Sequence, residues 1–333
     1  MNAYINGISY YTPEKNLTNE DLSKDFPEWE ADKISKKTGI KNRHIAAENE
    51  FASDMAIKAA NKLFNAYNID KKSIDFLIYC TQSPDYFLPS TSCIIQDKLG
   101  LNTSIGAFDF NLGCSGYVYG LSMAKAMIGS GMVNNILFLT SNTYSKYIHP
   151  KDKSNRTIFG DAATASLISN IKGIWSIENF EWGTNGKGAE NLIVKNGGIR
   201  NKENHGSDIY DENNLFIKND NYLYMNGGEI FNFTSEAVPI LIDSLLKKNN
   251  LTANDIDAFV LHQANKYMLE YIRRKMKIEP DKFIYYLEDV GNTVSNTIPI
   301  TLKEKCEKSV YKKLVLAGFG VGYSWGGCIL NKI

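Results

Sequence analysis

Two uninterrupted apolar runs of strand length occur far apart in the chain, and a helical pattern precedes each of them. The first run, residues 76–80, follows a helical pattern over residues 56–66; the second, residues 259–261, follows one over residues 236–248. A strand that is apolar along its whole length is typical of a parallel sheet covered on both faces. The pattern therefore predicts a layered α/β protein.

The chain carries an internal duplication. Residues 68–80 and residues 250–262 resemble each other at an offset of 182 positions, since 250 − 68 = 182. Each copy passes from a polar turn into one of the two apolar runs. We therefore predict two similar α/β halves, residues 1–172 and residues 173–333.

A second strand, turn and helix are predicted in each half. Residues 106–110 lead into a helix over residues 115–131, and residues 283–287 lead through a turn into a helix over residues 298–307. Open parallel sheets bind their ligands beyond the carboxyl ends of the strands. We therefore expect the active site between the halves, where these turns face each other.

The segment of about residues 183–222 differs in composition, because it is rich in Gly, Asn, Lys, Asp and Glu. We interpret it as an insertion or a hairpin that covers one face of the second half. Residues 192–194 are expected to form a short strand inside it.

Charge and composition exclude several classes of function. The chain has 37 basic and 37 acidic residues, so no global field draws it to nucleic acid or to an anionic membrane. No stretch approaches the ~20 apolar residues of a membrane span, and the N-terminus lacks the layout of a signal peptide. Five cysteines without CxxC spacing argue against a disulfide framework and a zinc site. We expect a cytoplasmic protein with reduced thiols and no metal.

Cys114 is the strongest candidate for chemistry in the first half. It lies between an apolar run and a helical segment of small and apolar residues. A helix that begins there directs its free N–H groups and its positive dipole end at the sulfur, which favours thiolate over thiol. A cysteine in apolar surroundings is more often a core residue, so this interpretation depends on the rest of the chain.

His262 and Asn292 occupy similar turns in the second half. A thiolate can take an acyl group from a thioester, while a neutral imidazole and a carboxamide can both donate to a second thioester carbonyl as negative charge builds on it. A lone His is more often structural, and an Asn in a turn is usually there for its backbone preferences. Their placement at matching ends of duplicated units favours carbon–carbon bond formation instead.

Ordered motifs run through nearly the whole chain, and together they resemble the β-ketoacyl-acyl-carrier-protein synthase III family of the thiolase-like superfamily. This resemblance implies a layered αβαβα fold made of two duplicated halves. The motifs are residues 7–13 (GISYYTP), 17–22 (LTNEDL), 38–46 (TGIKNRHIA), 88–90 (LPS), 111–116 (NLGCSG), 159–163 (FGDAA), 225–227 (MNG), 262–265 (HQAN), 291–293 (GNT) and 320–326 (GVGYSWG).

The resemblance also implies roles for single residues. By it, Cys114 is the acylated nucleophile, and His262 and Asn292 stabilise the enolate that forms when a malonyl group loses CO₂. The backbone N–H groups of Cys114 and Val321 form an oxyanion hole. The implied substrates are an acyl-CoA or other acyl thioester and malonyl-acyl carrier protein, with no separate cofactor. The implied product is a 3-oxoacyl-acyl carrier protein, as in the initiation of fatty-acid or related biosynthesis, and the implied assembly is a homodimer.

Candidates for the acyl pocket and for carrier docking follow from the same resemblance. Leu88 stands where members of the family carry a phenylalanine that closes the pocket from the partner subunit, and Phe159 is the second pocket candidate. A basic run on a helix is usually a solvated face, but this one lies beside the HQAN motif. The docking candidates in it are Lys266, Arg273 and Arg274.

The chain departs from the family pattern at two positions that concern the substrates. Lys33 occupies the position of the tryptophan that stacks on the adenine of CoA, and Tyr267 that of a carrier-docking arginine. The alternative function is therefore a specialised acyltransferase of a secondary-metabolite or surface-polysaccharide pathway, which passes the acyl group to an alcohol, an amine or another acceptor. His262 would then act as a general base.

Three other classes fit the sequence less well. A papain-type hydrolase shares the order Cys, His, Asn but not the signature around the cysteine. A nicotinamide dehydrogenase needs a complete GxGxxG and a βαβ unit, which residues 318–322 do not provide. A non-catalytic scaffold of the thiolase-like type would have lost the nucleophile, and Cys114 is present.

Overall fold

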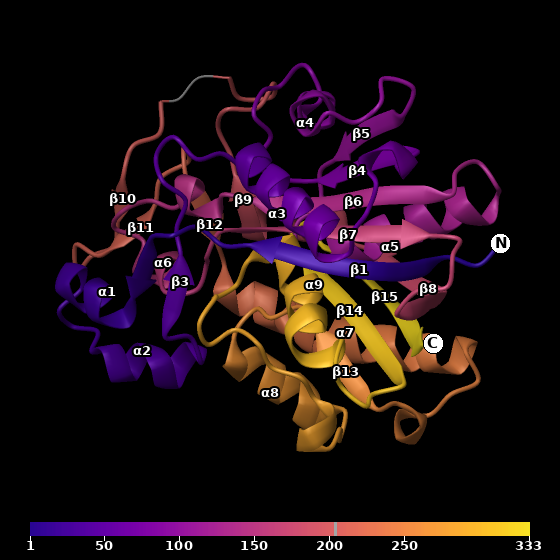
Figure 1. The fold of residues 1–333 in the computed structure, drawn as a ribbon. Helices are drawn as coiled ribbons and strands as arrows, with labels where there is room; N and C mark the ends of the chain where they lie inside the picture. The colour runs from indigo at the N-terminus through magenta and orange to yellow at the C-terminus, as the bar shows by residue number, and fades with distance from the viewer. Residues whose placement is uncertain (203–204) are drawn as a thin grey trace.

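The structure is a computed structural model that describes residues 1–202 and 205–333, in which strands and helices alternate along the chain (Figure 1). Residues 203 and 204 of the predicted insertion lie outside the described residues. The strands are β1 (Tyr4–Tyr11), β2 (Asn16–Thr18), β3 (Asn42–His44), β4 (Phe76–Cys80), β5 (Gly106–Phe110), β6 (Asn135–Asn142), β7 (Ala162–Ser169), β8 (Trp175–Thr184), β9 (Leu192–Val194), β10 (Ile209–Tyr210), β11 (Phe216–Lys218), β12 (Leu223–Met225), β13 (Ala258–Leu261), β14 (Lys313–Gly320) and β15 (Ser324–Lys332). The helices are α1 (Asn19–Asp25), α2 (Ala31–Thr38), α3 (Ala52–Ala66), α4 (Thr91–Leu99), α5 (Gly116–Gly129), α6 (Lys153–Arg156), α7 (Gly227–Lys248), α8 (Lys266–Lys275) and α9 (Thr297–Thr301).

The main sheet has nine strands in the order β13-β14-β15-β8-β1-β7-β6-β4-β5. Strands β1 and β8 join its two parts, which repeat one topology. In the first part β1 runs antiparallel to β7 and β7 to β6, while β6, β4 and β5 are parallel. In the second part β8 runs antiparallel to β15 and β15 to β14, while β14 and β13 are parallel. The strand order therefore repeats in the way that the duplicated sequence predicts.

The layers follow from which faces the helices cover. Helix α3 packs on β1, β6 and β7 of the first part, and α7 packs on β8, β14 and β15 of the second. Helices α5 and α9 both contact strands of the two parts and form the middle layer (Figure 1). A helix that packs against strands of both parts needs small residues where they approach closely: a methyl group at Gly120 of α5 would lie 2.0 Å from the Phe138 ring. This explains the mixture of small and apolar residues that predicted α5.

The prediction of a strand over residues 283–287 is wrong. Only Phe283 pairs there, through a single parallel bridge to Phe259 of β13. The buried side chain of Gln263 contacts the backbone that a ladder would use, because its amide donates to the carbonyl of Ile284 at 3.2 Å and accepts from the N–H of Tyr286 at 2.8 Å. A side chain thus replaces a strand partner, and the segment stays irregular.

Two predicted helices have different ends. Helix α7 begins at Gly227 rather than at residue 236, because the side chain of Asn226 caps it by accepting from the N–H of Glu229. Helix α9 ends at Thr301 and continues as a π-helical turn over Leu302–Cys306. The predicted helix over residues 298–307 is therefore only partly regular.

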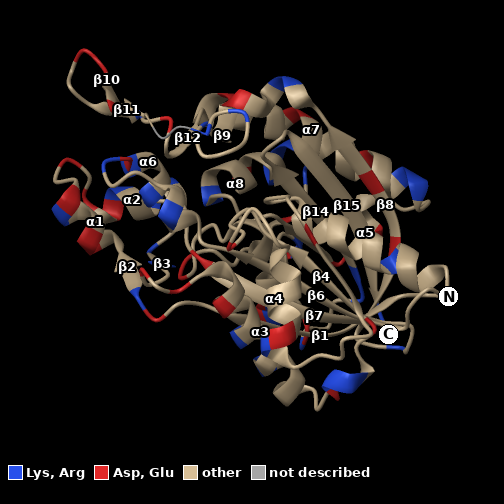
Figure 2. Cartoon of the chain, turned by 90° about the horizontal axis from the view of Figure 1, so that it is seen from above, with Lys and Arg blue, Asp and Glu red and all other residues tan. Residues whose placement is uncertain are grey.

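The segment predicted as an insertion contributes strands to two small sheets. Strand β9 confirms the strand expected at residues 192–194 and pairs with β12, and β10 pairs with β11. The β10–β11 hairpin projects from the body of the molecule, and charged residues of both signs are spread over the outer helices (Figure 2). Within the described ranges, no helix combines the length and apolar character needed to cross a bilayer.

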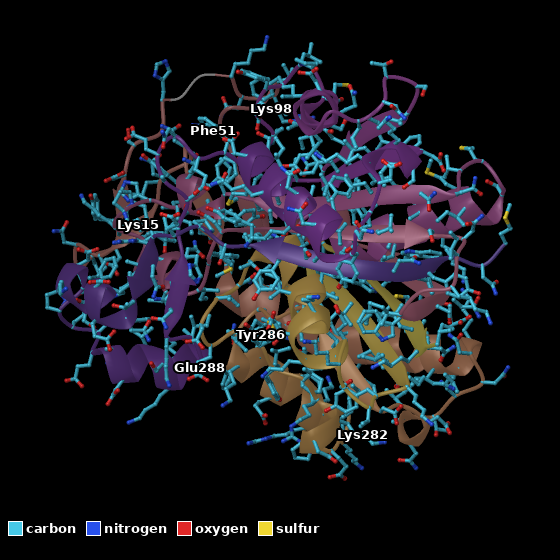
Figure 3. All side chains as sticks on the ribbon, viewed as in Figure 1. Lys15, Phe51, Lys98, Lys282, Tyr286 and Glu288 are labelled. Carbon is cyan, nitrogen blue, oxygen red and sulfur yellow. The ribbon has the colours of Figure 1, made fainter. Side chains whose placement is uncertain are left out.

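The halves also meet around the segment between Phe283 and Asn292. Glu288 pairs with Lys41 at 2.5 Å, and its carbonyl accepts from the N–H of Lys41. Tyr286 and Glu288 lie where the amino-terminal helices face the second half (Figure 3). The irregular segment is therefore held by residues of both halves, close to the carboxyl end of β13.

Candidate active site

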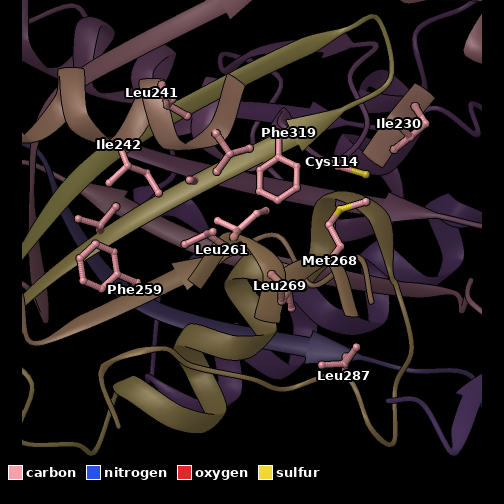
Figure 4. Close-up of a cluster of buried hydrophobic side chains, with 14 of the residues drawn as sticks. Cys114, Ile230, Leu241, Ile242, Phe259, Leu261, Met268, Leu269, Leu287 and Phe319 are labelled. Carbon is pink, nitrogen blue, oxygen red and sulfur yellow. The ribbon is translucent and has the colours of Figure 1, made fainter. Parts of the chain in front are cut away.

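One pocket of about 130 Å³ is lined by Cys114, His262 and Asn292 together. Cys114 follows β5 and His262 follows β13, so the pocket lies at strand ends of both parts of the sheet. Its wall is mostly apolar, and Figure 4 shows the sulfur of Cys114 near Met268 and Ile230. The structure thus brings together the three residues that the sequence singled out.

Cys114 lies in the turn two residues before α5 and is only 6% exposed. The end of β14 covers it, since a methyl group at Gly320 would lie 2.9 Å from its Cβ and 3.1 Å from its Sγ. Burial raises the pKa of the Cys114 thiol to about 12. Burial therefore favours the thiol, in opposition to the start of the helix, which was expected to favour thiolate.

His262 is buried directly after β13, where its backbone N–H donates to the carbonyl of Ala317 at 2.8 Å. Its ring packs edge-on against Phe319, and its Nδ1 lies 2.8 Å from Oγ1 of Thr297. Burial lowers the pKa of His262 to about 3, which a hydrogen bond with the Val294 backbone only partly offsets. The imidazole is therefore neutral near pH 7 and has one proton to place on either nitrogen.

Asn292 is oriented by its neighbours. Its backbone N–H donates to the carbonyl of Ile158, its carbonyl accepts from the N–H of Gly160, and its side-chain Oδ1 accepts from the N–H of Val294 at 2.9 Å. Because Oδ1 is occupied in this way, Nδ2 is the atom left to donate to a ligand. Asn292 can therefore act as a hydrogen-bond donor in the pocket.

Val294 is the backbone link between these two side chains. It is a buried β-branched residue with φ of 59°, in the left-handed region that such residues rarely adopt. Its N–H holds Asn292, and its carbonyl lies 3.2 Å from the hydroxyl of Thr297, which contacts His262. The strained turn thus positions both polar groups of the pocket.

The remaining pocket candidates lie in different surroundings. Phe159 is buried and lines the pocket. Val321 lies beside the turn of the nucleophile, because a methyl group at Gly113 would be 2.9 Å from its Cγ1. Leu88 is 86% exposed and does not line the pocket within the described part of the single chain.

The docking candidates on α8 also differ. Lys266 and Arg274 are exposed at the surface, whereas the guanidinium of Arg273 bonds to Glu270 and to the carbonyl of Ile278. Tyr267, 65% exposed, stands beside them, with its ring 5.7 Å from that of Phe231. Arg273 is therefore engaged within the chain, and Lys266 and Arg274 remain accessible, Arg274 with its Nε 3.4 Å from the same Glu270 carboxylate.

Sequence reasoning missed the residues that orient the pocket. Val294 and Thr297 were only part of an expected turn and helix, and Gln263 was only part of a motif. One signal was available, since a valine in the polar run between Asn292 and Thr297 is unusual in a turn. Its left-handed conformation has no marker in the sequence.

Comparisons with known proteins agree with this geometry. Residues 108–186 match the family model described as 3-oxoacyl-[acyl-carrier-protein (ACP)] synthase III, and residues 246–332 match its C-terminal model. The β-ketoacyl-[acyl-carrier-protein] synthase III of Clostridium perfringens is 33% identical, covering 99% of both chains. That of Lactococcus lactis is 35% identical, with the same coverage.

Solved structures extend the agreement to the fold. A 3-oxoacyl-(acyl-carrier-protein) synthase III crystal structure is 45% identical and superposes with a TM-score of 0.95, covering 99% of this chain and all of that one. The 3-oxoacyl-(acyl-carrier protein) synthase of Burkholderia xenovorans is 33% identical, with a TM-score of 0.91, covering 100% of this chain and 94% of that one. These matches confirm the predicted thiolase-like fold. The chain therefore belongs to the 3-oxoacyl-[acyl-carrier-protein] synthase III family, and it is an acyltransferase of that type.

Proposed function

We propose that the protein transfers an acyl group from an acyl-CoA to Cys114 and condenses it with malonyl-acyl carrier protein, releasing CO₂ and giving a 3-oxoacyl-acyl carrier protein. The observation that most supports this proposal is the convergence of Cys114, His262 and Asn292 in one apolar pocket. A buried thiol next to two neutral hydrogen-bond donors suits chemistry in which negative charge builds on thioester oxygens.

In the loading step the sulfur of Cys114 attacks the acyl carbonyl. The bond from that carbonyl to the sulfur of CoA breaks, and CoA leaves as a thiol with the proton that Cys114 has lost. Charge on the carbonyl oxygen is received by the backbone N–H groups of Cys114 and Val321. The close approach of residues 320 and 321 to the nucleophile supports this assignment.

In the condensing step His262 and Asn292 donate to the thioester carbonyl of the malonyl group. The bond to its carboxylate breaks, CO₂ leaves, and the electron pair is held as an enolate. The enolate carbon then attacks the acyl carbonyl on Cys114, and the carbon–sulfur bond breaks to release the thiolate, which takes a proton from solvent to return the thiol. Neutral donors suit this step, because the imidazole of His262 with its pKa of about 3 does not change its charge near pH 7.

The division of the chain belongs to the same proposal. We place the boundary after residue 172, because β8, which starts at Trp175, opens the second copy of the strand order. The first half supplies the nucleophile, and the second supplies both donors. The small sheet of β9 and β12 covers the pocket from one side, since Leu192 of β9 and Met225 of β12 line it.

A homodimer is proposed because β5 leaves a free sheet edge in the first half. Strand β5 is the last of the sheet, and its five residues are all partly exposed. An apolar edge strand with unpaired backbone groups is a template for pairing with a second copy. Phe87 and Leu88 extend this edge with 78% and 86% exposure. A second copy across β5 would cover Leu88 and bring it toward a pocket.

At the pocket mouth, Lys266 and Arg274 are proposed to contact the phosphates of the pantetheine arm or the acidic surface of the carrier. Both are exposed on α8, whose N-cap residue Asn265 lines the pocket. Single charge reversals there should raise KM for malonyl-acyl carrier protein without changing kcat.

The first experiment is intact-protein mass spectrometry after incubation with a panel of acyl-CoAs and acyl-carrier-protein thioesters. The wild type should gain the mass of one acyl group, and Cys114→Ala should gain none. Cys93→Ala, which removes an exposed thiol that does not line the pocket, is the matched control and should load normally. Loading of the Cys114→Ala protein would refute the assignment of the nucleophile.

The second experiment separates loading from condensation. His262→Ala and Asn292→Ala should still gain the acyl mass but should release CO₂ from malonyl-acyl carrier protein ~10²–10³-fold more slowly. Transfer of the loaded acyl group to an alcohol or amine, without CO₂ release, would instead support the specialised acyltransferase.

The assembly is tested by light scattering in solution. Leu88→Glu should convert the dimer to a monomer, because it places a charge at the proposed contact. Val310→Glu is the matched control, since Val310 is an apolar residue of the second half with 89% exposure. A wild-type monomer at micromolar concentration would contradict the proposed assembly.

A further inference from the structure

The peptide unit between Thr293 and Val294 is held at both ends by asparagine side chains. Its N–H donates to Oδ1 of Asn292 at 2.9 Å, and its carbonyl accepts from Nδ2 of Asn296 at 2.8 Å. The backbone N–H of Asn296 donates to the same carbonyl at 3.1 Å. Because a peptide unit is planar, the two side chains together fix the direction in which this plane is turned.

The direction of each hydrogen bond is fixed by partners that can act in only one way. A backbone N–H can only donate, so the atom of Asn292 that faces Val294 must be its oxygen. Two backbone carbonyls face the other amide, and a carbonyl can only accept. The atom that contacts Ala162 at 3.0 Å and Thr293 at 2.8 Å must therefore be Nδ2 of Asn296. Neither amide can be turned over without losing its partners.

The oxygen of Asn296 connects the same turn to the main sheet. It accepts from the hydroxyl of Thr140 of β6 at 2.6 Å, and the hydroxyl of Thr164 of β7 lies 2.6 Å from that of Thr140. Since the single hydrogen of the Thr140 hydroxyl goes to Asn296, Thr164 must be the donor to Thr140. All three residues are fully buried. The first half of the chain thus holds Asn296, which in turn holds the Thr293 carbonyl.

The held peptide has a conformation that needs such support. A β-branched residue rarely adopts the φ of 59° seen at Val294, so the surrounding structure must maintain it. Rotation of the peptide plane would change this φ and would withdraw the Val294 N–H from Oδ1 of Asn292. The amide of Asn292 could then turn, and its Nδ2 would lose its fixed direction.

We infer that Asn296 is a positioning residue, which holds the Thr293 carbonyl and thereby fixes the amide of Asn292 for its donation to the thioester carbonyl. This inference rests on the proposed function for its consequence, although the hold on the peptide can be observed without any substrate. Asn296 acts through the peptide and does not touch the reacting atoms, because it is fully buried and does not line the pocket.

Two variants that differ by one oxygen atom test the donation. Asn296→Ala removes the amide with all its contacts. Asn296→Ser also loses the contacts with the main sheet, but it keeps a hydroxyl that can donate to the Thr293 carbonyl three residues earlier, as Ser309 donates to Cys306 at 2.8 Å. Thr164→Val is the matched control, because it removes a buried hydroxyl from the same chain of hydrogen bonds and leaves both donations of Asn296 in place.

NMR can observe the Val294 N–H by itself, because Thr293–Val294 is the sole Thr-Val pair in the sequence. Full-length protein with ¹³C in the threonine carbonyls and ¹⁵N in valine therefore gives one signal in a spectrum that correlates each N–H with the preceding carbonyl. The signal should keep its wild-type position in Asn296→Ser and Thr164→Val. In Asn296→Ala it should move toward its position in Asn292→Ala, where Oδ1 is absent. An unchanged signal in Asn296→Ala, or an equal displacement in Asn296→Ser, would overturn the inference.

Kinetics supply the second readout. Asn296→Ala should load Cys114 at the wild-type rate but release CO₂ about 10–100-fold more slowly, with an unchanged KM for malonyl-acyl carrier protein, because misplacement of a group by about 1 Å can cost about 10²-fold. Asn296→Ser and Thr164→Val should keep most of the CO₂ release. Normal CO₂ release by Asn296→Ala would overturn the inference, and so would a loss of loading as large as the loss of CO₂ release.

Two further outcomes are distinguishable. If Asn296→Ala does not fold, Asn296→Leu is measured in the same way, because it keeps the branched shape of the side chain without its donors. Absence of CO₂ release from the wild type would refute the proposed function instead, while the Val294 signal would still test the hold of Asn296 on the peptide.

Discussion

The two halves share one strand order but use matching positions differently. In the first half β5 pairs along its whole length and leads to α5, a regular helix that starts two residues after Cys114. In the second half Phe283 is all that remains of the equivalent strand. The equivalent helix there is split into a 3₁₀ turn over Val294–Asn296, then α9, then the π turn Leu302–Cys306.

The difference shows what the placement of a nucleophile and the placement of two hydrogen-bond donors each require. A nucleophile needs to be placed once, at a helix start, and regular elements are sufficient for that. In the proposed condensation His262 and Asn292 donate to one carbonyl, so their side chains need to be turned individually. The second half achieves this with a left-handed Val294 and an interrupted helix, both of which are features found at functional sites. Irregularity is thus concentrated in the half that holds the donors.

The largest expected effect is on CO₂ release, when Asn292 loses its donor group but keeps its shape. Asn292→Asp keeps the acceptor oxygen that Val294 holds but replaces Nδ2 by a second oxygen. CO₂ release from malonyl-acyl carrier protein should fall by ~10²–10³-fold, while loading of Cys114 should persist. A loss of loading of the same size, seen by mass spectrometry, would mean that the two halves do not divide the steps.

The next effect concerns pH, because burial raises the pKa of Cys114 in the first half and lowers the pKa of His262 in the second. The pKa of Cys114 is raised to about 12, so its thiolate fraction should increase about tenfold per pH unit between pH 7 and pH 10. The pKa of His262 is lowered to about 3, so the imidazole stays neutral over the same range. The rate of Cys114 alkylation by iodoacetamide should therefore rise steeply, whereas CO₂ release by the acylated enzyme should not follow it.

A plateau of the alkylation rate near pH 7 would reverse this comparison. It would show that the start of α5 governs the thiol after all. The stability of the folded protein should also depend on pH, through His262 in the second half. Because the folded pKa of His262 lies below its ordinary value of 6.5, its contribution to stability is complete above pH 6.5 and is lost as the pH falls toward 3.

A smaller effect, on stability and on loading, is expected where Gly320 of β14 packs against Cys114. Gly320→Ala would place a methyl group 2.9 Å from the Cβ of Cys114, so it should lower the free energy of unfolding by about 1–3 kcal/mol and slow loading. Gly186→Ala is the control, because the space around Gly186 is open. Chemical denaturation measures both. Equal stability of the two variants would show that β14 does not confine the sulfur.

The smallest effect, on stability, tests whether the two turns at matching positions of the duplication are equivalent. Asn68 and Asn250 stand at the repeat offset, and both adopt a left-handed backbone, with φ of 50° and 53°. Replacement of either by Ala should lower the free energy of unfolding by about 1 kcal/mol, because Ala tolerates this conformation less well than Asn. The two losses should match. Unequal losses of unfolding free energy would mean that the two turns share a backbone conformation but contribute differently to stability.

Much of this architecture is predictable from the sequence because it depends on patterns that repeat. The apolar runs predicted β4 and β13, and the small residues after Cys114 predicted α5. Cys114 and His262 meet because each follows the carboxyl end of a strand in one part of the sheet, whereas Asn292 reaches the pocket from the irregular segment after Phe283. These features are set by burial, which leaves a record in the order of apolar residues.

The features that the sequence did not predict depend on single contacts. The loss of the strand after Phe283 is due to the amide of Gln263, which occupies the backbone groups of Ile284 and Tyr286. The high pKa of Cys114 depends on how closely β14 covers it, which no local pattern expresses. The roles of Val294 and Thr297 likewise depend on one backbone angle and one hydroxyl.

The place of β15 in the sheet has a consequence for how the protein is made. This strand is the last of the main sheet in sequence, yet it lies between β14 and β8 with partners on both sides. A ribosome releases residues from the amino terminus onward. Cys114 is therefore synthesised long before Gly320 can cover it, and Ser115 before its partner Ser324 exists. During translation the nucleophile remains uncovered until the final hairpin inserts, so a nascent chain with a reactive thiol should depend on a reducing environment or on chaperones until that moment.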